Sequence, residues 1–387
     1  MRYIVTLVLT FLAIHPMSCL AQATAINRYA DTIAYEVKYG RIIIPVEVKG
    51  RSHKYILDTG GQTATMWREV EQAKGELTGG QQVTTDMNGQ ANSYSKATLP
   101  EVKIGRYLRF TTLNTIALPE IQGFRDLGVV GILGGDAFKD VVISIDGHAQ
   151  QLRLFYPYRP KGLKLSDGIP LDYSPTWHIN FPLTFKDQSV QMMFDTGVPE
   201  LLTLGEDDFQ RLSQAQAATI TCEGVGSVGA GLEGLAKPKP LKYVRVAPFS
   251  ISGKKFENTP AMAATGIPTI LGAELLQYGT VTIDYPRGRF YFQPYETSTT
   301  DFANKKQTWN VGILPVNQRF EVTTIWGTTQ PQVEIGDEVT AVNGHDITAL
   351  PLSEMTIVDI FKELKGQEAE LTIRRHHQVF KVTIHKL

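Results

Sequence analysis

The strongest constraint on the fold of this 387-residue chain is an internal repeat. Three short motifs recur in the same order at an offset of 137 or 138 positions: Asp-Thr-Gly at 58–60 and 195–197 (195 − 58 = 137), Ile-Leu-Gly at 132–134 and 270–272, and an apolar segment ending in Asp at 142–146 and 280–284 (284 − 146 = 138). Chance rarely produces three landmarks at so constant an offset. The pattern therefore predicts a duplicated structural unit.

Each copy of the unit also has the same local pattern. Apolar segments such as 42–48 and 178–183 precede a short turn and a second apolar strand, at whose end Asp-Thr-Gly stands. This order is typical of a β-hairpin followed by a glycine-containing loop. Short helices are expected after each loop, at 67–74 and 206–216. With 34 glycines and 20 prolines spread along the chain, a mainly β fold with many turns is predicted.

Composition excludes several classes of protein. The chain has 42% hydrophobic and 20% charged residues, as an ordinary globular protein does. Its 38 basic and 39 acidic side chains leave a net charge of −1, which gives no electrostatic reason to expect a nucleic-acid partner. Two cysteines are too few for a disulfide scaffold or a Cys-rich zinc site, and the eight histidines show no metal-ligand spacing. We therefore expect no metal and no cofactor.

The paired Asp-Thr-Gly loops carry the predicted chemistry. One such tripeptide is most often an ordinary turn, but two copies at equivalent places can meet about a pseudo-twofold axis. That arrangement would bring Asp58 and Asp195 together. Two adjacent carboxyl groups share one proton, because ionising both is costly. The ionised carboxylate can then accept a proton from water while the protonated one donates to a substrate carbonyl, which is general acid–base hydrolysis.

These loops, with the two Ile-Leu-Gly segments, resemble those of bacterial aspartic peptidases of the pepsin and retropepsin type over about residues 35 to 296. The resemblance implies a bilobal pepsin-like acid-protease β-barrel domain in which Ile-Leu-Gly passes beneath each loop. It also implies a role for each loop residue: a catalytic dyad of Asp58 and Asp195, hydrogen bonds across the axis from Thr59 and Thr196, and close backbone approach at Gly60 and Gly197.

The sequence departs from the pepsin pattern directly after each loop. Pepsins usually place Ser or Thr there, whereas this chain has Gly61 and Val198, closer to the retropepsins. One donor fewer at the carboxylates predicts a less acidic dyad and activity nearer neutral pH. A catalytically inactive peptide-binding or scaffold protein with the same folds is the alternative.

Two glycine-containing segments need separate interpretations. Residues 83–90 contain Asn88 and Gly89, which suit the tip of a hairpin flap over the substrate, although an ordinary surface hairpin is an equal alternative. Residues 224–229 match G-x-G-x-x-G, but Pro238 and Pro240 follow where a dinucleotide site needs a helix. A glycine-rich hairpin is the better interpretation of that segment.

After residue 306 the pattern resembles that of a bacterial-type PDZ domain. A Gly-Asp turn, a short apolar strand and an Asn-Gly turn follow one another at 336–344. A helix is expected with Thr356 as its N-cap, because apolar residues recur at helical spacing: Ile357, Ile360, Phe361 and Leu364. The final strand is expected at 379–384.

PDZ domains bind an extended peptide as an added strand, with backbone amides capturing its terminal carboxylate. Val311, Gly312 and Ile313 are the candidates for that loop, and a C-terminal peptide is the possible ligand. A domain that only packs against the peptidase is the alternative.

The N-terminal residues have the layout of a secretory signal peptide. Arg2 precedes an apolar run at 4–14, and small residues follow, with cleavage expected after Ala21 or Ala23. A buried helix or a short membrane anchor is a weaker interpretation, because the run is much shorter than the ~20 residues that span a bilayer. Lipoprotein anchoring at Cys19 is weaker too, since the usual upstream leucine is missing. We expect an exported protein, periplasmic or secreted, with no transmembrane segment in the mature chain.

Together these features predict an exported aspartic endopeptidase that acts on peptides or proteins. The expected organisation is a signal peptide (1–21), two peptidase lobes (22–160 and 161–296), a linker (297–306) and a PDZ-like α+β domain (307–387).

Overall fold

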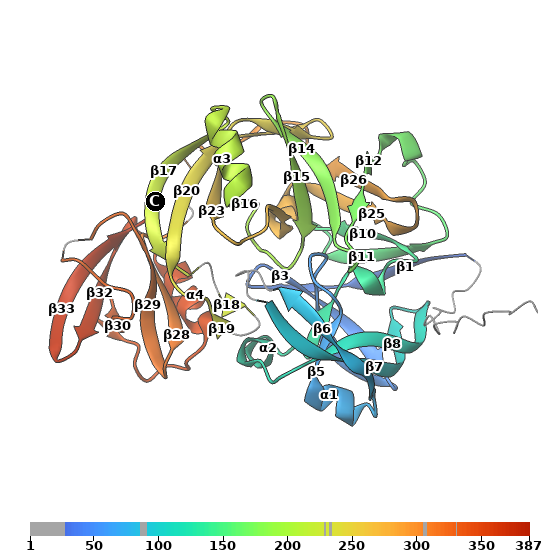
Figure 1. Ribbon diagram of the computed structural model, residues 1–387, viewed down its shortest axis with the longest axis horizontal. Coiled ribbons are helices and arrows are strands. Elements are labelled where there is room, and N and C mark those ends of the chain that lie inside the picture. Colours follow the sequence, from blue (N-terminus) through green and yellow to red (C-terminus); the bar gives the residue numbers. More distant parts are fainter. Residues whose placement is uncertain (1–27, 86–90, 228–229, 232–233, 305–307, 330) are drawn as a thin grey trace, which may run out of the picture.

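The computed structural model describes residues 28–85, 91–227, 230–231, 234–304, 308–329 and 331–387. The predicted mainly β fold is confirmed: strands dominate and the helices are short. Figure 1 shows two β lobes beside each other and a C-terminal module that packs at one end. The predicted signal peptide and Cys19 lie outside the described residues. Among those residues, no helix is long and apolar enough to cross a membrane.

The first lobe is built on one sheet and two short helices. The helices are α1 (Trp67–Gln72) and α2 (Gln122–Leu127). The strand order in the sheet is β2 (Glu36–Lys38), β3 (Arg41–Val48), β4 (Arg51–Leu57), β9 (Gly131–Leu133), β5 (Ala64–Met66), β8 (Leu108–Leu118), β7 (Ala91–Ile104) and β6 (Glu76–Thr85). The short strand β9 is parallel to β4 and antiparallel to β5, so it lies between the two strands that flank the first Asp-Thr-Gly loop.

The second lobe repeats this arrangement. Its helix is α3 (Glu206–Gln214), and its strand order is β13 (Asp172–Tyr173), β14 (Ile179–Phe185), β15 (Gln188–Asp195), β24 (Ile270–Gly272), β16 (Leu202–Gly205), β23 (Thr259–Ala264), β20 (Lys239–Val246) and β17 (Ala218–Gly226). Strand β24 is parallel to β15 and antiparallel to β16, as β9 is to its neighbours. The repeat in the sequence is therefore a repeat in the topology.

A third sheet joins the lobes at their base. Its order is β1 (Tyr29–Ala34), β11 (Gln151–Tyr156), β10 (Val142–Asp146), β25 (Gly279–Asp284), β26 (Arg289–Pro294) and β12 (Ile169–Pro170). At its centre, Ser144 pairs with Thr282, its own counterpart at offset 138 (282 − 144), and the Thr282 hydroxyl donates to Ser144 Oγ at 2.9 Å. A residue that pairs with its own counterpart marks the pseudo-twofold axis.

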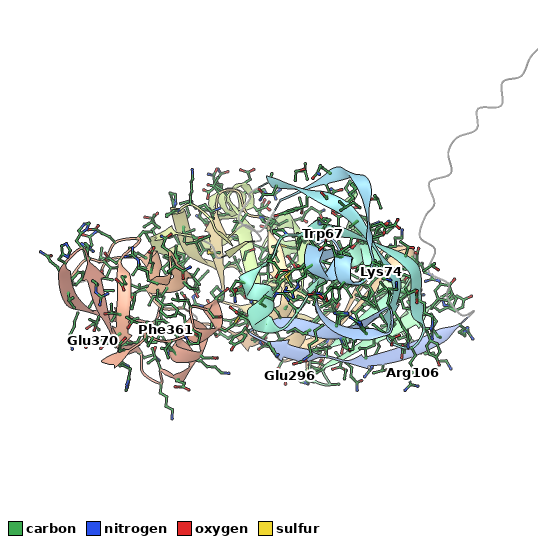
Figure 2. All side chains as sticks on the ribbon, turned by 90° about the horizontal axis from the view of Figure 1, so that it is seen from below. Trp67, Lys74, Arg106, Glu296, Phe361 and Glu370 are labelled. Atoms are coloured by element: carbon green, nitrogen blue, oxygen red, sulfur yellow. The ribbon has the colours of Figure 1, made fainter. Side chains whose placement is uncertain are left out.

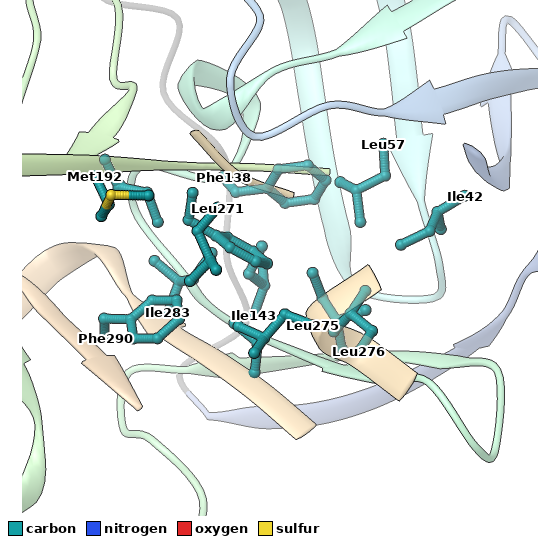
Figure 3. Packing of buried hydrophobic residues seen from close by; sticks show 14 of the residues in the cluster. Ile42, Leu57, Phe138, Ile143, Met192, Leu271, Leu275, Leu276, Ile283 and Phe290 are labelled. Atoms are coloured by element: carbon teal, nitrogen blue, oxygen red, sulfur yellow. The ribbon is translucent and has the colours of Figure 1, made fainter. Parts of the chain in front are cut away.

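One apolar core runs through both lobes. Leu57 and Phe138 of the first lobe belong to the same buried cluster as Met192 and Leu271 of the second, and Figure 3 labels all four. All four are essentially inaccessible to solvent. Fully burying a side chain of this size contributes about 1.5–3 kcal/mol. The lobes are thus held together by a shared interior as well as by the joining sheet.

The C-terminal module has an apolar core of its own, which includes Val322, Leu371 and Val382. Its elements are β28 (Val311–Val316), β29 (Arg319–Trp326), β30 (Glu338–Val342), β31 (His345–Asp346), α4 (Glu354–Glu363), β32 (Glu368–Arg375) and β33 (Gln378–His385). Figure 2 places the labelled Glu370 of the module at the end of the molecule far from Trp67, Lys74 and Arg106 of the first lobe.

The N-cap of helix α4 differs from the prediction. The N-cap is Ser353, three residues before Thr356 (356 − 353), and its hydroxyl accepts the Met355 N–H at 3.1 Å. The Thr356 hydroxyl donates instead to the Pro351 carbonyl at 2.8 Å. A Ser side chain is as good an N-cap as Thr, so the sequence offered two starts and the tertiary structure selected the earlier one.

The described part of the predicted linker, 297–304, is fixed against the second lobe. Strand β27 (Thr300–Asp301) pairs with β22 (Lys254–Glu257), which pairs with β21 (Phe249–Ile251). Phe302 is buried in the core of the lobes. Polar composition suggested a free linker at 297–306, but one aromatic side chain and a strand edge fix it against the second lobe.

The module is also joined to the second lobe through main-chain pairing. Residues 224–226 of β17 pair with 324–326 of β29, so the sheet of the lobe continues into the module. A Cβ on Gly224 or Gly226 would stand 2.5 Å from a carbonyl oxygen of β29. Gly224 and Gly226, the first two glycines of the G-x-G-x-x-G match, therefore allow strands β17 and β29 to approach each other closely.

The remaining elements are short. They are the strands β18 (Ala230–Gly231) and β19 (Gly234–Leu235) and the 3₁₀ turns η1 (Gly135–Ala137), η2 (Leu165–Asp167), η3 (Ala273–Gln277) and η4 (Tyr285–Arg287).

Candidate active site

The two Asp-Thr-Gly loops are positioned by equivalent strand pairs. Asp58 follows β4, and its N–H donates to the Leu133 carbonyl of β9 at 3.0 Å. Asp195 ends β15 and is in register with Gly272 of β24. Each Ile-Leu-Gly segment is thus a strand beside the loop it was expected to support. Because these strands are buried, the loops have a rigid base.

The loops are locked together by their threonines. The Thr59 N–H donates to Thr196 Oγ1 at 3.1 Å, and the Thr196 N–H donates to Thr59 Oγ1 at 3.1 Å. Each hydroxyl then donates across the axis to a main-chain carbonyl, Thr59 to Phe194 at 2.9 Å and Thr196 to Leu57 at 2.7 Å. Both side chains are fully buried, so four hydrogen bonds without competing water fix the relative position of the loops.

Glycines allow each loop to touch the carboxyl group of the other. A Cβ on Gly60 would lie 2.2 Å from Asp195 Cγ, and one on Gly197 would lie 2.8 Å from Asp58 Cγ. Gly61 is restricted in the same way, because its Cβ would lie 2.8 Å from Asp58 Cγ. The departure from the pepsin pattern at Gly61 therefore has a steric reason here.

The two carboxyl groups lie within hydrogen-bonding reach of each other, and each shifts the pKa of the other. Burial raises the pKa of Asp58 well above its ordinary value, and the charge and hydrogen bond of Asp195 raise it further. Burial also raises the pKa of Asp195, but the Gly197 N–H, at 2.7 Å from Asp195 Oδ1, and the hydrogen bond from Asp58 favour its ionised form. Asp58 Oδ1 has no hydrogen-bond partner among the described residues. Asp58 is therefore the better candidate for the protonated member.

Another acidic residue that the sequence analysis missed supports the first loop. Asp136 Oδ1 accepts the Thr63 N–H at 2.9 Å and the Thr63 hydroxyl at 2.7 Å, and Thr63 Oγ1 accepts the Gly134 N–H at 3.2 Å. This network ties the segment after Asp58 to the segment after β9. The repeat could have revealed Asp136, because another acidic residue, Glu274, occupies the same place in the second copy (274 − 136 = 138).

A cavity of about 1300 Å³ opens above the carboxyl pair. Asp58 and Asp195 line it together with apolar side chains of the first lobe, including Ile116, Leu118 and Phe124. The C-terminal module contributes residues 314–318 and 352–355 to the same cavity. The lining is more apolar than polar, but it also includes charged side chains such as Arg41, Glu120 and Glu354. The volume exceeds that of a typical small-molecule pocket.

His178 is a second residue that the sequence analysis missed. It lines the cavity, and its Nε2 lies 3.2 Å from Thr176 Oγ1. Burial lowers the pKa of His178, although the charge of Asp195 acts in the opposite direction. A neutral imidazole beside the pair can donate or accept a hydrogen bond. No sequence motif marks His178, because the residue reaches the cavity only through the folding of the 174–178 turn.

The structure describes the peptide-loop candidates but not the flap candidates. Asn88 and Gly89 lie outside the described residues, although Val83 and Thr84 of the preceding strand line the cavity. The prediction that residues 311–313 form a carboxylate-binding loop is wrong. Val311, Gly312 and Ile313 form the first half of strand β28 and pair with β29, because two of the three side chains belong in the core of the module.

Among the described strands, β28 pairs with β29 alone, and its other edge lacks one donor. Val316 pairs with Arg319 around a two-residue turn, so the nitrogen of Pro315 faces away from β29. A proline has no N–H to give to an added strand. A peptide that pairs with β28 would lose this hydrogen bond.

Among the described residues, no group of three or more His, Cys, Asp or Glu side chains could hold a metal ion.

One comparison with known proteins matches the part of the chain that contains the first Asp-Thr-Gly loop. The model of a family described as aspartyl protease matches residues 44–137, which include Asp58 but end before Asp195. No curated protein matches the chain.

Among solved structures, an aspartic proteinase from Irpex lacteus is 14% identical, with a TM-score of 0.42, over 70% of this chain and 99% of its own. Conglutin gamma, a basic 7S globulin from lupine seeds, is 12% identical, with a TM-score of 0.40, over 69% of this chain and 95% of its own. Basic 7S globulin from soybean is also 12% identical, with a TM-score of 0.40, over 70% and 96%.

Proposed function

We propose that this protein is an aspartic endopeptidase that hydrolyses peptide bonds in the cavity between its lobes. The observation that carries the proposal is the pair of Asp58 and Asp195 within hydrogen-bonding reach, held by loops that interlock through Thr59 and Thr196. A structural role alone does not require two buried acids in contact, because burying carboxyl groups costs free energy. The match to the aspartyl protease family over 44–137 supports the same chemistry.

The unequal environments of the two acids suggest their roles. Asp195, which accepts the Gly197 N–H, acts as the base and takes a proton from the attacking water. Asp58, whose pKa is raised further, acts as the acid and donates to the oxygen of the scissile carbonyl. Addition of water gives a gem-diol, with the proton from water on Asp195 and the proton of Asp58 on the former carbonyl oxygen. Asp195 then donates its proton to the amide nitrogen as the C–N bond breaks, and Asp58 takes a proton back from a hydroxyl of the gem-diol, so the pair is regenerated without a covalent intermediate. An extended peptide is the expected substrate, because residues of both lobes line a cavity of about 1300 Å³.

Replacing Asp58 by Asn tests this proposal, because the amide keeps the shape of the side chain and cannot exchange the proton. The assay is cleavage of a broad peptide library from pH 3 to 8, followed by mass spectrometry. We expect cleavage by the wild type and its loss in Asp58→Asn, with peptide binding retained. Asp187→Asn, in an exposed turn of the β14–β15 hairpin, is the matched control and should cleave normally.

A catalytically inactive peptide-binding or scaffold protein is the competing function. It predicts no cleavage by the wild type under any of these conditions and equal peptide binding by the wild type and Asp58→Asn. That outcome would overturn the endopeptidase proposal.

We further propose that the protein is exported and that the C-terminal module controls how peptides reach the cavity. The module's position supports the second proposal, since residues 314–318 and 352–355 line the cavity. Recruitment of a C-terminal peptide along β28 is the PDZ-like version, and the missing donor at Pro315 weakens it. N-terminal sequencing of the protein from fractionated cells tests export: a mature end at residue 22 or 24 outside the cytoplasm is expected, and an intact N-terminus in the cytoplasm would refute it.

A further inference from the structure

The N-terminus of helix α4 reaches from the C-terminal module into the catalytic cavity. Met355, in the first turn of this helix, lines the cavity that also contains Asp58 and Asp195. In the sequence it stands 160 positions after Asp195 (355 − 195). In Figure 1, α4 lies on the side of the module that faces the lobes.

The Met355 side chain packs with the first lobe. It is 8% exposed and belongs to an apolar cluster whose other buried members all lie between residues 43 and 132. Several of these line the cavity as well: Ile56, Ala64, Ile116, Leu118, Phe124, Leu127 and Ile132. The apolar part of the cavity on this side is therefore built jointly by the first lobe and one residue of the module.

Contacts with both lobes hold α4 in place. The pairing of β17 with β29 fixes the module to the second lobe, and the Thr324 hydroxyl donates to the Ser227 carbonyl at 3.1 Å. On the first lobe, the Tyr39 hydroxyl donates to Asp359 Oδ2 of α4 at 2.9 Å. A side chain that is held from two sides is a fixed wall of the cavity and can discriminate by size.

We propose that Met355 is a specificity-determining residue, which closes an apolar subsite of the peptidase and selects the size of the substrate side chain bound there. This inference rests on the proposed endopeptidase function and adds the substrate class: extended peptides with an apolar side chain at a fixed position from the cleaved bond. The cavity stays open with Met355 in place, so the residue shapes the site without filling it. An unbranched thioether adapts to linear apolar side chains, which this subsite should prefer.

The size of the expected effect follows from hydrophobic pockets in general. One methylene more or less in such a pocket changes kcat/KM by about 10- to 200-fold. Met355→Ala removes the thioether end and should shift the preference by at least about tenfold toward larger apolar side chains. Met355→Phe should shift it toward smaller ones. For peptides that differ only at other positions, each variant should change all rates by the same factor, so the ratios between these rates stay as in the wild type.

The experiment is cleavage-site profiling of a digested, unfolded protein mixture, followed by kcat/KM for peptides that differ only at the selected position. Val358→Ala, at an exposed position of the same helix, is the matched control and should keep the wild-type profile. Met355→Leu conserves volume and is used if the Ala variant does not fold. It should retain the apolar preference with a smaller shift.

Three results would overturn the inference. An unchanged profile in every folded Met355 variant would show that the side chain does not reach the substrate. An equal rise in cleavage at all sites would show that Met355 obstructs the cleft. No cleavage by the wild type would remove the endopeptidase function and this inference with it, whereas wild-type cleavage with an unchanged profile would remove the inference alone.

Discussion

Replacing Thr196 by Val is the sharpest test of the loop interlock. Valine keeps the shape of the side chain but removes the hydroxyl that accepts the Thr59 N–H at 3.1 Å and donates to the Leu57 carbonyl at 2.7 Å. Residues 57, 59 and 196 are completely buried, so no water replaces these bonds. Each unsatisfied buried group costs about 1–3 kcal/mol, so two of them should lower the free energy of unfolding by roughly 2–6 kcal/mol. That is a large part of the 5–15 kcal/mol typical of a native protein.

The matched control is Thr196→Ser, which keeps the hydroxyl and loses one methyl group. It should cost only about 1 kcal/mol. Urea denaturation followed by tryptophan fluorescence gives the difference in free energy of unfolding between the two variants. Peptide cleavage measures the second consequence, because a shift of about 1 Å in a catalytic group can reduce the rate by about a hundredfold.

Thr59→Val completes a double-mutant cycle. Thr59 Oγ1 accepts the Thr196 N–H at 3.1 Å and donates to the Phe194 carbonyl at 2.9 Å, so the two threonines belong to one network. The double variant should be less destabilised than the sum of the single variants, with a coupling of about 0.5–3 kcal/mol. Equal stabilities of Thr196→Val and Thr196→Ser, or strictly additive single effects, would refute the interlock as the feature that holds the loops.

Three further predictions concern the dyad and the seam to the module. The raised pKa of Asp58 means that the folded protein holds a proton that the unfolded chain loses above about pH 4, so wild-type stability should fall as pH rises toward the folded pKa, by up to about 1.4 kcal/mol per pH unit. Asp58→Asn should make this decrease smaller in urea titrations at pH 4 to 8 and leave the part that comes from the raised pKa of Asp195. Parallel curves for the two proteins would contradict this expectation. Gly60→Ala places a Cβ 2.2 Å from Asp195 Cγ and should abolish cleavage, whereas retained activity would show that the loops are not in contact. Gly226→Ala places a Cβ 2.5 Å from the Thr323 carbonyl oxygen and should increase hydrogen exchange across 319–326, and unchanged protection there would argue against the β17–β29 seam.

Parts of the fold and of the site were predictable from sequence because their signals are local or repeated. The mainly β fold follows from turn residues and alternating apolar segments, and the structure confirms it. The constant offset placed Asp58 and Asp195 at equivalent positions, and the structure brings their carboxyl groups together. The offset also anticipates the pairing of Ser144 with Thr282, since an axis that relates two copies must pass between equivalent residues.

Other features were missed because their signals are not local. The polar segment at 297–306 resembled a linker, yet Phe302 finds a place in a core built by distant residues. Ser353 and Thr356 are equally good N-caps by type, and only the packing of α4 decides between them. His178 has no motif at all, because it becomes part of the cavity only when its turn folds over the loop that carries Asp195.

The sequence by itself determined that two copies of one β unit would each present an acid on a tight glycine loop, since hydrophobic alternation, turn chemistry and repetition are written in neighbouring residues. Only the tertiary structure decided which side chains meet. The contact between the carboxyl groups, the edge-to-edge joining of β17 with β29, and Met355 in the wall of the first lobe all depend on strand register and close packing between segments far apart in the chain. Such contacts are selected by shape and burial over the whole molecule, and no short stretch of sequence records them.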